Sequence, residues 1–303
     1  MKIDKSNGNV KYNDEEHLYW DDNGKFISVT TLIGKFCQPF DSDYWSSYKA
    51  IERVLDKETF KIAKKDLQNN ISIDKIIEAF DIDREDFNSA KQDILDEWQR
   101  KNIEACERGT KIHADLEHSF TKKKETDMKK YGLGGKFLIN TNDSLNKSNI
   151  ELLDIDKGVF PEYLIYRTSD DNKFRLAGQI DLLIKDGNDI YIRDYKTNSK
   201  IDEKSYYNPR TKKYQMMNYP LNNLMDCNKV HYALQLSTYA WMLQKLNPNF
   251  KIKDLILYHF DHNDNETLYH CDYLKDEVQR MLYYYKKQLI QQELKNKRKP
   301  IEY

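Results

Sequence analysis

The alternation of apolar and polar positions is clearest over residues 174–198, where it predicts two β-strands joined by a tight turn. The connecting residues Lys-Asp-Gly-Asn-Asp have the length and the glycine of a hairpin loop. Each strand also carries a carboxylate among apolar neighbours, Asp181 in the first strand and Asp194 in the second. Lys196 follows Asp194 by two residues, so strand alternation predicts that both side chains share one face. Because buried charges are costly unless they are paired or bind a metal, this hairpin is a candidate site.

The N-terminal part of the chain is predicted to hold a short hairpin followed by helices. An Asn-Gly pair within His17–Ser28 indicates the hairpin turn. Ser28 and Asp41 stand where helix N-caps are expected, before helical segments at 29–36 and from residue 42 onward. Over residues 57–99 apolar side chains recur at helical intervals. We expect this region to be a helical packing layer, and a role in covering the substrate is the alternative.

On either side of the central hairpin the pattern predicts the rest of an α/β chain. A strand is expected at 159–166, a helix at 231–243, two strands at 251–261 and 266–272, and a closing helix with a basic end at 275–299. The polar segment 121–149 is rich in lysine and glycine and is expected to be a mobile or excursion loop. We expect this segment either to have no functional role or to contact a polyanion through its backbone.

Composition and charge limit the classes of protein. A chain of 303 residues forms one large domain or two modest ones. The net charge of −1 gives no global positive field, so any nucleic acid must be bound by local basic patches. The four cysteines are far apart and suit reduced thiols in a cytosol. The first residues lack the apolar core of a signal peptide, and no apolar run reaches membrane-spanning length, so a cytoplasmic location without membrane contact is expected.

Further polar residues stand in patterns that suggest chemistry, each with an ordinary structural alternative. His113 and Glu117 share one face of a predicted helix, which also describes a surface pair or a satisfied core contact. Zinc is disfavoured there, because neither a second histidine at zinc spacing nor a cysteine follows. Glu162 is an acid inside an apolar strand. Gln235 and Tyr239 share a face of a mostly apolar helix, where an uncharged glutamine requires a buried partner.

Two of these signals are unspecific when taken alone. An acid two residues before a lysine recurs elsewhere in this highly charged chain, and a solvated strand end also explains Asp194-x-Lys196. After Lys196 the sequence becomes basic and aromatic, which suits contacts with phosphates and stacked bases but also suits a solvated loop. The candidate DNA-binding residues in this segment are Lys200, Arg210, Lys212 and Lys213.

Five separate sequence motifs nevertheless occur in a characteristic order along the chain. They are Gly109-Thr-x-x-His113-x-x-x-Glu117, Glu162, Gly178-x-x-Asp181, Asp194-x-Lys196 and Gln235-x-x-x-Tyr239. This order resembles the PD-(D/E)XK nuclease superfamily, specifically its RecB-like exonuclease branch, and phage exonucleases similar to the mitochondrial genome maintenance exonuclease. The resemblance touches most of residues 12–245.

The resemblance implies an α/β fold of the restriction-endonuclease type, with a central mixed sheet flanked by helices and a helical N-terminal region. A single nuclease domain is expected over residues 1–303. Its N-terminal hairpin and helical region would span 1–108, and its catalytic core would span 109–303 and end in the basic helix.

The resemblance also implies a metal centre. His113, Asp181, Asp194 and the carbonyl oxygen of Tyr195 would hold the ion. Carboxylate oxygens suit Mg²⁺ or Mn²⁺, and the imidazole favours Mn²⁺ relative to an all-oxygen site. No iron–sulfur cluster is expected, because the late cysteine triplet of the relatives that carry one is missing.

Other residues would act around this metal. Lys196 would position or deprotonate the attacking water, and Glu162 would contact the outer shell of the metal or assist it. Gln235 and Tyr239 would brace Lys196 and contact the DNA backbone near the scissile phosphate. Glu117 would support His113.

The expected function is therefore a metal-dependent exonuclease that hydrolyses phosphodiester bonds from DNA ends, with single-stranded DNA as the expected substrate. It would serve phage or host DNA recombination, repair or replication, in the cytosol of a bacterial host if it is phage-encoded. The alternatives are a structure-specific endonuclease of the same fold and a non-catalytic DNA-binding module. A partnership with a single-strand annealing or replication protein is a further alternative.

Overall fold

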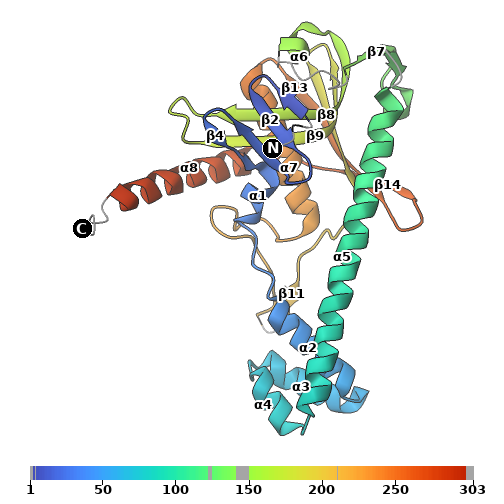
Figure 1. The fold of residues 1–303 in the computed structure, drawn as a ribbon. Helices are drawn as coiled ribbons and strands as arrows, with labels where there is room; N and C mark the ends of the chain where they lie inside the picture. The colour runs from blue at the N-terminus through green and yellow to red at the C-terminus, as the bar shows by residue number, and fades with distance from the viewer. Residues whose placement is uncertain (1–2, 4, 122–124, 141–149, 210, 298–303) are drawn as a thin grey trace. The chain divides into compact units, whose positions relative to one another are not determined.

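The computed structural model describes residues 3, 5–121, 125–140, 150–209 and 211–297 and divides into two compact units (Figure 1). The first unit contains Met1–Cys37, Lys111–Tyr207 and Tyr214–Tyr303, and the second contains Gln38–Thr110 and Asn208–Lys213. The grouping of residues 1–303 into a single nuclease domain stays a prediction. None of the described helices is both long and apolar enough to cross a membrane.

A mixed eight-stranded sheet forms the centre of the first unit, in the order β14-β13-β10-β9-β8-β7-β6, with β5 paired to β9. The hairpin predicted at 174–198 is confirmed, because β9 and β10 pair in antiparallel fashion, whereas β10 and β13 run parallel. The strands are β5 (Ile27–Ser28), β6 (Glu125–Asp127), β7 (Lys136–Ile139), β8 (Lys157–Thr168), β9 (Arg175–Asp186), β10 (Asp189–Lys196), β13 (Lys251–Phe260) and β14 (Glu266–His270).

Both faces of this sheet are buried, which explains the nearly continuous apolar sequence of its central strands. On one face Leu183 and Ile192 pack with α7 (Asn228–Leu246) in the largest core cluster. That cluster also includes residues of α1 (Val29–Gly34), α6 (Ile150–Asp154) and α8 (Lys275–Lys297). On the other face Leu182 and Ile184 pack with the last turns of α5 (Arg84–Thr121). The predicted fold class, a mixed sheet flanked by helices, is confirmed.

A smaller four-stranded sheet precedes α1. Its strands are β1 (Lys5–Asn7), β2 (Val10–Asn13), β3 (Leu18–Asp21) and β4 (Gly24–Lys25), each antiparallel to the next. The hairpin expected within His17–Ser28 is confirmed as β3 and β4, whereas the sequence pattern did not indicate β1 and β2. Ser28 caps α1 as expected, because its side-chain oxygen accepts a hydrogen bond from the backbone N–H of Thr31 at 3.0 Å.

The second unit is helical, as the apolar spacing predicts. It contains α2 (Ser42–Val54), α3 (Lys57–Gln68), α4 (Ile73–Ala79) and the part of α5 up to Thr110. Their buried faces form a separate core that includes Ile51, Phe60 and Ile94. Asp41 caps α2 by accepting the backbone N–H of Tyr44 at 2.9 Å. Two short strands, β11 (Tyr207–Asn208) and β12 (Lys213–Tyr214), pair with each other.

The expectation of an excursion loop at 121–149 is wrong for the part that the structure describes. This part forms β6, a 3₁₀ turn (Lys129–Tyr131) and β7, which pairs in parallel with β8 at Leu138↔Gly158. Met128 and Phe137 are fully buried against the sheet. Their burial explains why this lysine-rich segment is ordered. Residues 122–124 and 141–149 lie outside the described residues.

Candidate active site

Two acids face each other across neighbouring strands at a break in the strand pattern. Glu162 of β8 and Asp181 of β9 lie between the register pairs Pro161↔Leu182 and Tyr163↔Ile180. Glu162 has a φ of +50°, which is rare and strained for a residue with a side chain. Like charges directly opposite each other in a sheet are destabilising. This position therefore calls for a positive group between the two carboxylates.

The core packing shows the same break. Strict alternation sends residues three apart to opposite faces of a sheet. Phe160 and Tyr163 nevertheless belong to one core cluster, and so do Ile180 and Leu183 on the next strand. The alternation of side chains between the two faces is therefore interrupted at the same position in both strands. Glu162 and Asp181 stand at this interruption, and neither belongs to an apolar core cluster.

His113, near the end of α5, supplies the positive group. Its Nδ1 lies 3.7 Å from Glu162 Oε1 and 3.7 Å from Asp181 Oδ2, and its Nε2 lies 3.1 Å from the carbonyl oxygen of Tyr195. Since a carbonyl only accepts, Nε2 carries the hydrogen and Nδ1 faces the carboxylates, an arrangement common for metal-binding histidines. Burial alone would lower the pKa of His113, but Asp181 and Glu162 outweigh it and raise the pKa to about 9. In the metal-free protein His113 is therefore protonated at neutral pH, and the imidazolium supplies the positive charge beside the two carboxylates.

The side chain of Asp181 also accepts a backbone hydrogen bond where the regular strand pairing stops. The regular pairing of β9 with β10 ends at Arg193↔Leu182, and beyond it Asp181 Oδ2 accepts the backbone N–H of Tyr195 at 2.7 Å. Burial raises the pKa of Asp181, and the neighbouring His113 opposes that effect. The carboxylate is thus fixed in direction and needs a cation to remain ionised.

A second charged pair lies at the end of β10. Lys196 Nζ is 2.6 Å from Asp194 Oδ2, and the side chain of Asp194 is only 1% exposed. The shared face predicted for this pair is therefore present, and the alternative of a solvated strand end does not hold. Burial raises the pKa of Asp194 to about 6, with Lys196 opposing it. Burial alone would lower the pKa of Lys196, but Asp194 and Asp181 raise it, so the amine is a cation.

Helix α7 supplies the partner of Asp194. The side-chain nitrogen of Gln235 donates to Asp194 Oδ1 at 3.1 Å and lies 3.2 Å from the hydroxyl of Tyr239. This contact provides the buried partner that the glutamine requires. The ring of Tyr232 lies against Lys196 Nζ, at 4.7 Å from ring centre to nitrogen. Helix α7 therefore fixes both members of the charged pair.

Three of the candidate metal-binding side chains lie close together. One ligand atom each of His113, Glu162 and Asp181 lies within 4.8 Å of the others, at separations too long for direct hydrogen bonds from the imidazole. Two carboxylates and one imidazole fit Mn²⁺ or Mg²⁺. Asp194, expected from sequence as a ligand, is held by Lys196 and Gln235. The ligand set itself stays a prediction.

Two further contacts lie beside Glu162. Lys5 Nζ of β1 is 3.4 Å from Glu162 Oε2 and 3.6 Å from Glu117 Oε1, so Glu117 contacts this lysine rather than His113. The side-chain nitrogen of Gln179 donates to Glu162 Oε2. The sequence gives no sign of Lys5, because it stands in a short polar strand far from every motif.

The candidate DNA-binding residues after Lys196 do not all belong to one unit. Lys200 belongs to the first unit, is largely exposed and pairs with Asp202 at 2.7 Å. Lys212 and Lys213 belong to the second unit, and Arg210 lies outside the described residues. Their role in DNA binding stays a prediction.

The family model of the PD-(D/E)XK nuclease superfamily matches residues 71–302, which include the histidine, the acids, the lysine and the glutamine of this site. The chain belongs to the PD-(D/E)XK nuclease superfamily. PD-(D/E)XK nucleases typically use Mg²⁺ or Mn²⁺. The donor set of His113, Glu162 and Asp181 agrees with that chemistry.

Other comparisons add little to the PD-(D/E)XK assignment. No curated protein gives a significant match to the chain. Among the solved structures that match is the crystal structure of SSO0001, at 17% identity and a TM-score of 0.27. That match covers 44% of this chain and 50% of the other, so this chain spans about half the length of the protein that it matches.

Proposed function

We propose that this chain is a metal-dependent exonuclease of the RecB-like branch that hydrolyses phosphodiester bonds from DNA ends, with single-stranded DNA as its substrate. The observation that carries the nuclease chemistry is the convergence of His113, Glu162 and Asp181 within 4.8 Å, beside the buried Asp194–Lys196 pair. The exonuclease part of the proposal rests on the order of the five sequence motifs, which resembles that of phage exonucleases. A place in phage or host DNA recombination, repair or replication, beside a single-strand annealing or replication protein, belongs to the same proposal.

The proposed metal site uses His113, Glu162 and Asp181, with Asp194 at its border. A divalent cation bound there would lower the pKa of a bound water and neutralise charge on the phosphate. The hydrogen bond from His113 Nε2 to the Tyr195 carbonyl orients the imidazole, so that Nδ1 is turned toward the carboxylates and would be available to a bound cation. The hydrogen bond from the backbone of Tyr195 does the same for Asp181.

Lys196 acts as a cation in this proposal. Its raised pKa leaves it protonated at neutral pH, so it donates hydrogen bonds to the attacking water or to a phosphate oxygen rather than removing a proton. Gln235 holds Asp194 Oδ1, which leaves Asp194 Oδ2 to hold the ammonium in place. Burial among acids therefore fixes both the position and the charge of Lys196.

The test compares linear and circular single-stranded DNA. Linear strands labelled at the 5′ or the 3′ end, and a closed circle of the same sequence, are incubated with Mn²⁺, with Mg²⁺ or with a chelator. We expect mononucleotides or short products from one labelled end, an intact circle and no cleavage with the chelator. Cleavage of the circle would instead show the endonuclease, and DNA binding without any cleavage would show the non-catalytic module.

A matched pair of lysine variants ties the activity to the site. Lys196→Met removes a buried ammonium, whereas Lys253→Met removes one whose side chain is 48% exposed. We expect cleavage to fall by roughly a hundredfold or more in the first variant, as for loss of one group that stabilises transition-state charge, and to change little in the second. Equal losses in both variants would contradict the role of Lys196.

A further inference from the structure

A second group of metal-binding side chains lies apart from the acids of the nuclease site. Cys37 follows α1, Asp226 lies in the segment before α7, and His231 is in the first turns of α7. His231 Nε2 is 3.3 Å from Cys37 Sγ and 2.6 Å from Asp226 Oδ1. The three ligand atoms lie within 4.8 Å of one another. None of these residues takes part in the nuclease chemistry proposed above.

The two contacts of His231 Nε2 cannot both be hydrogen bonds, because one imidazole nitrogen has either one hydrogen or one lone pair. In the metal-free protein Nε2 donates to Asp226 at 2.6 Å, and the Cys37 thiol donates to the carbonyl of Ile33 at 3.6 Å. A nucleophilic Cys-His-Asp relay is also excluded, because the acid in such a relay bonds to the opposite ring nitrogen from the thiol. Here thiol and carboxylate face the same nitrogen. A cation bound by all three atoms would take the place of the proton between His231 and Asp226 and of the thiol proton of Cys37.

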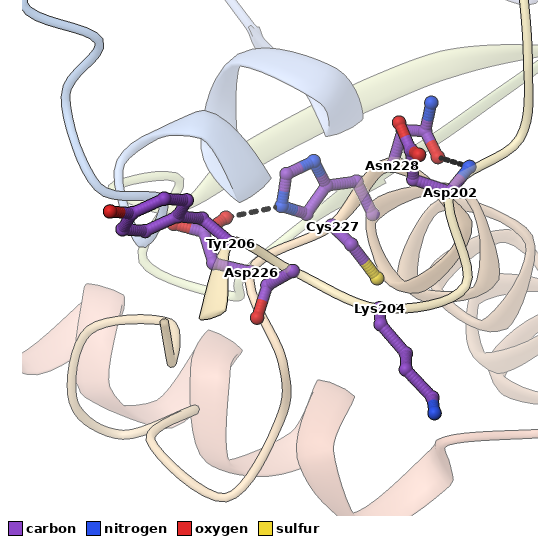
Figure 2. A pocket seen from close by; sticks show the side chains of 8 residues that line it. Asp202, Lys204, Tyr206, Asp226, Cys227 and Asn228 are labelled. Atoms are coloured by element: carbon purple, nitrogen blue, oxygen red, sulfur yellow. Dashed lines mark hydrogen bonds and ion pairs between the residues drawn. The ribbon is translucent and has the colours of Figure 1, made fainter. Parts of the chain in front are cut away.

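The donor atoms select the kind of ion. Sulfur and imidazole nitrogen with one carboxylate suit Zn²⁺, whereas Mg²⁺ and Mn²⁺ prefer oxygen ligands. A cavity of about 450 Å³ lies beside the group and is lined by Asp226, Cys227 and His231 among others (Figure 2). It provides room for a water molecule as the fourth ligand of a tetrahedral ion.

The backbone holds the cysteine in place before any ion binds. Asn218 donates its side-chain N–H to the carbonyl of Cys37 at 3.0 Å and its backbone N–H to the carbonyl of Phe36 at 2.7 Å. The side chain of Asp226 is only 5% exposed, and Cys37 and His231 are half-buried. The three ligands therefore stand on fixed elements around a partly enclosed point.

We propose that Cys37, Asp226 and His231 form a Zn²⁺ site with three protein ligands, which fastens the end of α1 to α7. His231 precedes Gln235 by one helical turn, and Gln235 holds Asp194. An ion at this site therefore fixes the helix that positions the charged pair of the nuclease site. This inference is independent of the nuclease activity.

The experiment titrates metal-stripped protein with Co²⁺ and then displaces it with Zn²⁺. A thiolate ligand gives Co²⁺ a sulfur-to-metal charge-transfer band, which the oxygen-rich nuclease site does not give. We expect this band in the wild type and in Asp194→Ala, where the nuclease site is altered, and in Cys106→Ser, where an exposed cysteine is replaced. We expect its loss in Cys37→Ser, with Zn²⁺ affinity lower by more than roughly 100-fold. A missing band in the wild type, or an unchanged band in Cys37→Ser, would overturn the proposal.

A second measurement needs no variant and covers the case in which Cys37→Ser does not fold. Alkylation of each thiol in the wild type is followed by mass spectrometry, with and without Zn²⁺. We expect Zn²⁺ to slow the alkylation of Cys37 and to leave that of Cys106 unchanged. Equal rates for Cys37 in both conditions would refute the site.

Discussion

The contact between Gly178 and Tyr239 allows a sharp test of how the active site is packed. Gly178 lies in β9, three residues before Asp181, and its backbone is not in the left-handed region. A Cβ atom at this position would lie 2.5 Å from Tyr239 Cε1 and 3.1 Å from its hydroxyl oxygen. The glycine is therefore required for the close approach of α7 to the sheet, and Gly178→Ala removes that space.

The expected cost follows from two opposing terms. Forcing a methyl group into a packed core costs about 1–3 kcal/mol. Replacing a glycine within a strand by alanine stabilises the fold by about 0.5–1 kcal/mol, because the unfolded chain then loses less conformational entropy on folding. The free energy of unfolding should therefore fall by up to roughly 2.5 kcal/mol. Displacement of Tyr239 also moves its neighbour Gln235, so we expect kcat to fall by up to about 100-fold, as for a shift of about 1 Å at a positioned group.

Urea unfolding and the single-strand cleavage assay measure the two effects. Gly34→Ala is the matched control, because a Cβ there meets nothing within 4 Å. The decisive comparison repeats Gly178→Ala in a Tyr239→Ala background, where the ring is gone and the added methyl should cost nothing. If the substitution is as destabilising there as in the wild type, the clash with Tyr239 is not its cause.

Two further predictions use the charged groups of the first unit. In metal-free protein the pKa of His113, raised to about 9, means that its stabilisation is complete below about pH 6.5 and is lost as the pH rises through 9. Between pH 6 and pH 9.5 the free energy of unfolding of the wild type, followed by thermal unfolding, should fall by about 1–2 kcal/mol after a discount for solvent screening. The variant His113→Gln should lack this fall. Equal falls in both proteins would contradict the role of His113. Arg193 is buried and its Nη2 lies 3.1 Å from Asp254 Oδ2, so Asp254→Ala should cost about 2–3 kcal/mol in urea unfolding. Asp189→Ala, which breaks an ion pair with the half-exposed Lys253, should cost less than about 1 kcal/mol, and similar costs for both would refute the argument.

Local patterns in the sequence predicted much of this fold. The hairpin of β9 and β10, the caps Ser28 and Asp41 and helix α7 each depend on residues close together in the chain, and each is present. The pair Asp194 and Lys196 was predictable for the same reason, because strand alternation alone puts the two side chains on one face.

Features that depend on distant or irregular backbone were not predictable in this way. The left-handed φ of Glu162 and the interruption of alternation shared by β8 and β9 bring Glu162 to His113, and no residue pattern signals either. Lys5 reaches Glu162 across 157 positions of the chain. Strands β6 and β7 contain as many charged residues as apolar ones, so their composition does not indicate that Phe137, or Met128 just after β6, is buried.

The contact between Lys5 and Glu162 bears on how far this chain can be shortened from its N-terminus. The superfamily match begins at residue 71, yet Met1–Cys37 belongs to the same compact unit as the acids of the site. A chain shortened to the matched region would lose β5, which pairs with β9 at Ile27↔Leu176. It would also lose α1, whose Leu32 is fully buried in the main core. The smallest fragment able to fold around this active site therefore extends well before the boundary that sequence similarity marks.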